Sequence, residues 1–105
     1  MIHAVFEQKN GRLCGVTVKG HAEYADPGED IVCAAVSSAV QYATILITES
    51  FQEKDRESEQ DGKITVRLLH PEQGQSALVL AGLYQHLQFL SEDYPGTIQL
   101  DITEV

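Results

Sequence analysis

Residues 31–51 are apolar on nearly every side of the helix that their composition predicts. A helix without a wide polar face is stable only when neighbouring elements surround it, so this segment has to lie at the centre of the fold. Its small residues, among them Ala35, Ala39 and Ala43, permit close packing on a sheet or on a second copy of the chain. The remainder of the chain must therefore supply the surface that covers this helix.

Segments with the periodicity of strands lie on both sides of the central helix. Apolar and polar residues alternate in residues 2–7 and again in 13–18, and the Asn10-Gly11 pair between them is typical of the turn of a β-hairpin. Two further alternating segments occupy residues 64–68 and 98–103. The chain therefore contains four predicted strands.

A second helix is predicted between the last two strands, from an apolar stripe that ends before Pro95-Gly96 and consists of Leu80, Leu83, Leu87 and Leu90. Residues 52–62 are dominated by acidic side chains, and we interpret them as a solvated helix end and loop. The order strand, strand, helix, strand, helix, strand predicts an α+β fold. In this fold two helices cover one face of a four-stranded mixed sheet.

Size and charge limit the classes of function. Residues 1–105 are long enough for one domain with a two-layer core. Seven Lys and Arg against 16 Asp and Glu give a formal net charge of -9, which repels nucleic acid and anionic lipid surfaces and favours encounter with basic polypeptides. No run of about 18 consecutive apolar residues is present for a membrane span, and the N-terminus lacks the pattern of a signal peptide. We therefore expect a cytoplasmic protein with no direct nucleic-acid partner and no membrane partner.

The two cysteines, Cys14 and Cys33, differ in their surroundings. Cys14 is in register with Val16 and Val18 of an alternating segment, so we expect it on the buried face of a strand. Cys33 is expected in the first turn of the central helix, where the helix dipole favours a thiolate and the free backbone amides, including its own, are candidate donors to an oxyanion.

His21, Asp30 and Cys33 together supply a base, a carboxylate and a thiol. In the catalytic interpretation His21 deprotonates Cys33 and Asp30 orients the imidazole, as in other nucleophile-base-orienter sites. In the alternative interpretation Asp30 only caps the helix. Ser37 lies one helical turn after Cys33, where its hydroxyl reaches either the site or the carbonyl of the preceding turn.

The same residues carry a resemblance to a known family. The run Gly20-His21-Ala22, followed after a loop by the string DIVCAAVS that starts at Asp30 and ends at Ser37, resembles the signature of the bacterial ribosomal-processing cysteine protease (Prp) family. The resemblance implies a cysteine endopeptidase that removes the N-terminal extension of large-subunit ribosomal protein twenty-seven during ribosome assembly. It also implies a homodimer.

The loop of residues 22–29 joins His21 to the helix that carries Cys33, so it has to lie beside the site. Gly20 permits a tight turn there, Gly28 permits movement, and Tyr24 either stacks on the substrate or anchors the loop; these three are candidate substrate contacts. No metal site is predicted, because the histidines and cysteines lack CxxC or HxxxH spacing. No cofactor is implied.

Two other classes of function stay open. One is a non-catalytic, ribosome-associated module that binds a basic peptide tail, and the other is a thiol hydrolase that acts on a small ester or thioester. The reactivity of Cys33 separates catalysis from binding, since a catalytic thiol is alkylated faster than a model thiol and loses that advantage in His21→Ala.

Overall fold

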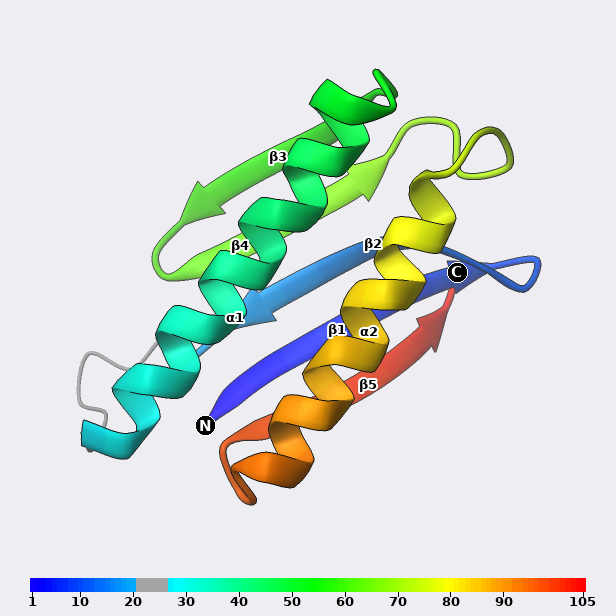
Figure 1. The fold of residues 1–105 in the computed structure, drawn as a ribbon. Coiled ribbons are helices and arrows are strands. Elements are labelled where there is room, and N and C mark those ends of the chain that lie inside the picture. Colours follow the sequence, from blue (N-terminus) through cyan, green and yellow to red (C-terminus); the bar gives the residue numbers. More distant parts are fainter. Residues whose placement is uncertain (21–26) are drawn as a thin grey trace.

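A computed structural model of the chain contains one five-stranded sheet with both long helices on the same face (Figure 1). The structure describes residues 1–20 and 27–105, with side chains for 1–20 and 31–105. In chain order, the elements are β1 (Ile2–Lys9), β2 (Arg12–Lys19), α1 (Pro27–Ile45), the π-helical turn η1 (Leu46–Ser50), β3 (Asp55–Gln60), β4 (Lys63–Leu68), α2 (Ser76–Asp93) and β5 (Ile98–Glu104).

The sheet is mixed and has the strand order β3-β4-β2-β1-β5. β1 pairs antiparallel with β2 and parallel with β5, and β4 pairs antiparallel with both β2 and β3. The predicted α+β class, with a mixed sheet and two helices, is confirmed. The predicted N-terminal hairpin is also confirmed, since Asn10 and Gly11 have φ angles of 53° and 78°, as the central residues of a type I′ turn require.

The prediction of four strands is wrong, because part of the acidic segment forms β3. Acidic and polar residues on both faces of residues 55–60 hide the alternation that marks a half-buried strand. The strand forms nevertheless because Asp61 and Gly62, with φ angles of 54° and 73°, close a two-residue hairpin against β4. Polar side chains are tolerated on both faces of this edge strand because all but its first residue are exposed to solvent.

The central helix begins earlier than predicted. α1 starts at Pro27, so Gly28 lies in the helix rather than in a loop, and Asp30 is inside the helix rather than at the N-cap position that precedes it. Asp30 therefore does not occupy the N-cap position, and its role in the site stays a prediction. Counted from Pro27, Cys33 is the seventh residue of α1 and lies in its second turn. Its amide consequently falls outside the first four residues, which are those that lack a partner within the helix.

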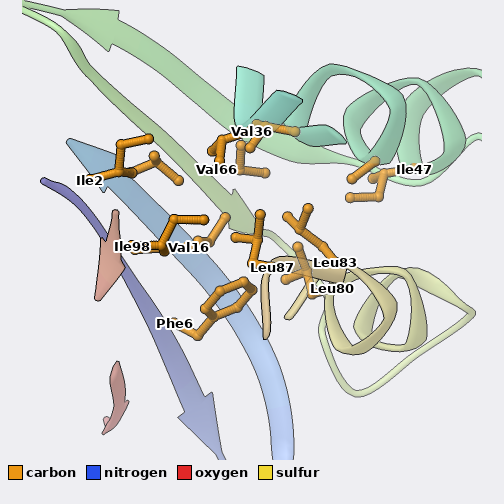
Figure 2. Close-up of a cluster of buried hydrophobic side chains, with 14 of the residues drawn as sticks. Ile2, Phe6, Val16, Val36, Ile47, Val66, Leu80, Leu83, Leu87 and Ile98 are labelled. Carbon is orange, nitrogen blue, oxygen red and sulfur yellow. The ribbon is translucent and has the colours of Figure 1, made fainter. Parts of the chain in front are cut away.

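The hydrophobic core fills the space between the helices and the sheet (Figure 2). β1 contributes Phe6, whose ring meets that of Tyr84 edge-on, with centroids 5.1 Å apart and an interplanar angle of 87°. Both helices bury one stripe of residues at one-turn spacing. The buried members on the helices include Val32, Val36, Val40, Ala43, Ile47, Leu80, Leu83 and Leu87.

One stretch, Ile31–Ser50, is by length and composition apolar enough to cross a membrane, with a mean hydropathy of 1.8. A core helix passes the same test. The valines on the inner side of α1 pack on the sheet, while 28% of the stretch is buried within the fold. The outer side of this helix is therefore unusually apolar for a surface that faces away from the core.

Candidate active site

Cys33 occupies the second turn of α1, where it is half-buried and packs against the hydrophobic cluster. The neighbouring Val32 and Val36 are fully buried, which determines the rotation of α1 about its axis. Ser37 is also half-buried and lies one turn after Cys33 on the same side of the helix. The structure thus places Cys33 and Ser37 on one flank of α1, beside the stripe that faces the sheet.

The other predicted members of the site fall partly outside the described residues. His21 and Tyr24 lie outside them, and Gly28 and Asp30 are described only as part of the backbone of α1. The roles of these four residues stay predictions.

Gly20 directly follows β2. Its φ angle is 92°, and a Cβ atom at this position would overlap the carbonyl oxygen of Met1. Both the left-handed backbone and the close approach of the neighbouring chain therefore require glycine here. This structural requirement stands whether or not Gly20 also contacts substrate.

Cys14 does not have the predicted place in the core. The pairing of β1 with β2 shifts between Glu7 and Gln8, and this bulge leaves Cys14 out of the register that Val16 follows. Its thiol donates a hydrogen bond to the carbonyl of Glu7, with an Sγ–O distance of 3.4 Å. Burial, and secondly the negative charge of Glu7, raise the pKa of the Cys14 thiol. Cys14 is therefore a poorly ionised thiol outside the hydrophobic cluster.

A metal centre finds no support in the described residues, where no three His, Cys, Asp or Glu side chains come together as ligands.

Two further features of the structure are not predicted by the sequence. One is a groove of about 930 Å³ between α1 and α2, whose lining includes Ala39, Tyr42, Leu78 and Gly82. The other is an acidic row on β3, which consists of the carboxylates of Asp55, Glu57 and Glu59. It lies in the segment for which the sequence predicts a helix end and loop. The Asp61-Gly62 pair, a hairpin signal of the same kind as Asn10-Gly11, is the sequence feature that could have revealed the strand.

Comparisons with known proteins agree on one family. The family model described as "Cysteine protease Prp" matches residues 1–99. The ribosomal processing cysteine protease Prp of Staphylococcus aureus (strain Mu50) is 27% identical over 93 residues, covering 87% of this chain and 88% of that protein. A crystal structure of an essential ribosomal processing protease Prp from S. aureus with a covalently linked product peptide matches with a TM-score of 0.87 and 25% identity, over 98% of this chain and 100% of that one.

A second S. aureus Prp structure, in complex with a substrate peptide, has the same fold, with a TM-score of 0.91, 24% identity and the same coverage of 98% and 100%. The shared fold and the match to the family model together define the class of this protein as a cysteine protease. The chain belongs to the Prp family of ribosomal-processing cysteine proteases, as the motif across residues 20–37 indicates.

Proposed function

We propose that this chain is a cysteine endopeptidase that removes the N-terminal extension of large-subunit ribosomal protein twenty-seven during ribosome assembly, with Cys33 as its nucleophile. The observation that carries the proposal is the half-buried thiol of Cys33 on α1, in a chain that the Prp family model matches over residues 1–99. The S. aureus relative with a covalently linked product peptide supports covalent catalysis for the family.

The proposed reaction has two stages, each with a balanced transfer of a proton. The Cys33 thiolate attacks the scissile carbonyl carbon, and the protonated imidazole of His21 gives its proton to the leaving amine as the C–N bond breaks, which leaves a thioester. Water then attacks the thioester while His21 accepts its proton. The C–S bond breaks, which restores the thiolate and the protonated imidazole, and the carboxylic acid product releases its remaining proton to solvent as it leaves as a carboxylate. Asp30 is proposed to orient the imidazole, because a carboxylate beside a thiolate is favourable only with a cation between them.

Donors for the oxyanion are proposed at the start of α1. A helix leaves the amides of its first four residues unpaired, and Pro27 has no amide, so Gly28, Glu29 and Asp30 are the candidates. Loss of one such donor typically lowers the rate by about 10²–10³. Ser37 is proposed to contact the bound peptide, since it lies one turn from Cys33 on the same side of α1.

The first test is mass spectrometry of a synthetic peptide that spans the end of the ribosomal extension. We expect wild type and Cys14→Ala to cleave the peptide at one bond, and Cys33→Ala and His21→Ala to leave it intact. Cys14→Ala is the matched control because it removes the other thiol of the chain. An intact peptide that nevertheless binds would favour the non-catalytic binding module. Turnover of small thioesters with an intact peptide would favour the small-molecule thiol hydrolase.

A homodimer in the cytoplasm is the proposed form of the protein. Large apolar side chains are exposed on the outer side of the helices, with exposed fractions of 65% for Tyr42 and 70% for Leu78, both of which line the groove between α1 and α2. Light scattering during size-exclusion chromatography tests this proposal. We expect Leu78→Glu to halve the mass of the particle and Gln99→Glu, which adds the same charge on the distant β5, to leave it unchanged.

A further inference from the structure

β3 is a free edge of the sheet. In the described part of the chain it pairs only with β4, through the register that runs from Asp55 opposite Leu68 to Gln60 opposite Lys63. An unpaired edge presents backbone N–H and C=O groups that another extended chain can bind. Figure 1 shows β3 as the outermost strand at one edge of the sheet, next to β4.

The register identifies which backbone groups of β3 point outward. The amide of Leu69 donates to the carbonyl of Lys54 over 3.1 Å, so positions 54 and 69 face each other as a hydrogen-bonded pair. Such pairs alternate along an antiparallel ladder, so positions 56, 58 and 60 also turn their backbone groups toward β4. The amides and carbonyls of Asp55, Glu57 and Glu59 therefore point away from the sheet.

The side chains of the same three residues lie on the face that carries the helices. Asp55, Glu57 and Glu59 stand opposite Leu68, Val66 and Ile64, which belong to the hydrophobic cluster or pack against it, and cross-strand partners share a face. On the other face Arg56 stands opposite Arg67. Acidic and basic side chains are thus sorted to opposite faces of the edge strand.

Two of these carboxyl groups influence each other. After burial, Glu57 contributes to the raised pKa of Asp55, and one oxygen of Asp55 is buried without a hydrogen-bond partner among the described residues. Glu57 and Glu59 are exposed. The acidic row therefore offers two accessible carboxylates next to a third that is partly desolvated. A cationic side chain bound there would stabilise their negative charge.

The acidic row lies at the same end of the sheet as the candidate active site. Glu59 stands opposite Ile64, and Ile64 stands opposite Val18, which lies one residue before the end of β2 at Lys19. In Figure 1 the β3–β4 turn, the end of β2 and the first turns of α1 lie on the same side of the molecule. An extended peptide that passes the start of α1 can therefore continue along β3.

We infer that β3 is a docking strand that adds an extended basic segment of the peptide substrate to the sheet, with Lys or Arg at alternate positions facing Glu57 and Glu59. Charge complementarity selects this occupant. A second copy of β3 would bring rows of like charge together, which disfavours pairing of two edges. The inference rests on the proposed function, because it assigns the flanking part of the same peptide to this edge.

The test measures peptide binding to the Cys33→Ala protein, which keeps the peptide intact. One fluorescent peptide has Lys at every second position with Thr between, and its isomer has the same residues with the lysines contiguous. We expect the alternating peptide to bind more tightly, and Glu57→Gln/Glu59→Gln to weaken its binding on the order of tenfold at low salt, as the loss of two exposed ion pairs predicts. Asp101→Asn/Glu104→Gln removes the same charge from the opposite edge strand, β5, and should leave binding unchanged.

Amide hydrogen exchange locates the bound peptide. The outward amides of Glu57 and Glu59 should be protected when the alternating peptide is bound. Three results would overturn the inference. Peptide affinity could fall equally in the two double variants, or the two peptides could bind equally well. The bound peptide could also protect amides in the groove between α1 and α2 instead of those in β3. It would also be wrong if Glu57→Gln/Glu59→Gln only made the protein self-associate, since the carboxylates would then serve to protect the edge.

The proposed function fails in a different way. A wild-type protein that binds the alternating peptide at β3 but cleaves no ribosomal peptide would contradict the endopeptidase and support the docking strand. Cleavage with the same kcat/KM in wild type and Glu57→Gln/Glu59→Gln would support the endopeptidase and contradict the docking strand.

Discussion

The carboxylate of Glu53 caps the N-terminus of α2 by accepting the backbone amide of Ser76 over 3.0 Å. It also accepts the amide of Gln75 over 2.8 Å and the hydroxyl of Ser76. Gly74 leaves room for this contact, because a Cβ atom there would overlap the carboxylate. The helix is therefore capped by a residue 23 positions away in the sequence rather than by a local N-cap side chain.

Glu53→Gln should lower the melting temperature at neutral pH. The neutral side chain of Gln lacks the negative charge that strengthens these hydrogen bonds in Glu53. The hydroxyl of Ser76, and then the amide of Gln75, lower the pKa of Glu53. A carboxyl with a lowered pKa stabilises the fold above its unfolded pKa, and this stabilisation is lost as the pH falls through the folded value. The difference in melting temperature should therefore vanish in acid. Glu49→Gln, at an exposed carboxylate of η1, is the matched control and should change little at either pH.

Asp55→Asn should stabilise the protein above about pH 6. Burial, followed by the hydrogen bond and charge of Glu57, raises the pKa of Asp55 to about 6. The folded state therefore binds a proton more tightly than the unfolded state, and the ionised carboxyl weakens folding at neutral pH; the penalty fades as the pH falls from about 6 toward the ordinary Asp value.

We expect a gain of about 1 kcal/mol in the free energy of unfolding for Asp55→Asn at neutral pH, since partial exposure screens much of the effect. Urea denaturation at several pH values measures it. A gain that stays constant from neutral pH into acid would contradict the titration of Asp55 as its cause.

Gly20→Ala should destabilise the fold by more than about 1 kcal/mol, because strain at a positive φ adds to the overlap with Met1. Gly62→Ala separates the two causes, since Gly62 has a φ of 73° but an open space around its Cβ position. Thermal unfolding of both variants gives the comparison. Equal destabilisation would show that Met1 moves aside and that the backbone strain alone matters.

Cys14 should be alkylated slowly at neutral pH, since burial and the charge of Glu7 raise its pKa and keep it a thiol. Glu7→Gln should speed the alkylation of Cys14 a few-fold by removing the second of these causes. Peptide mapping after timed exposure to iodoacetamide measures Cys14 and Cys33 separately. An unchanged rate at Cys14 would mean that burial alone limits its reactivity.

Leu87→Ala should cost about 2–5 kcal/mol, because Leu87 is fully buried between α2 and the sheet and its truncation leaves a cavity. Phe89→Ala, two residues along the same helix, is the matched control, since 57% of Phe89 is exposed. Chemical denaturation of the two variants tests the packing of α2 in Figure 2. Similar losses of stability would place α2 in a different rotation on the sheet.

The strongest predictions from sequence are those whose signal is local. Asn10-Gly11 indicates a hairpin because few other residue pairs adopt two positive φ angles, and Ile2, Ala4 and Phe6 mark one face of β1 because side chains alternate along a strand. The start of α1 was placed too late, because Asp30 offers a plausible cap and nothing local shows that the helix continues back to Pro27.

The residue pattern is sufficient to predict the α+β class, the central apolar helix and the place of Cys33 in that helix, because periodicity and motif are properties of neighbours along the chain. The folded chain, and not the local residue pattern, determines that a bulge beside Glu7 removes Cys14 from the core and that Glu53 caps α2, whereas the Asp61-Gly62 pair already marks the hairpin that contains β3. The cap is the clearest case, because Glu53 lies 23 positions from Ser76 in the sequence. Backbone hydrogen bonds and caps are satisfied by whichever group the folded chain brings near, and local residue patterns carry no record of that partner.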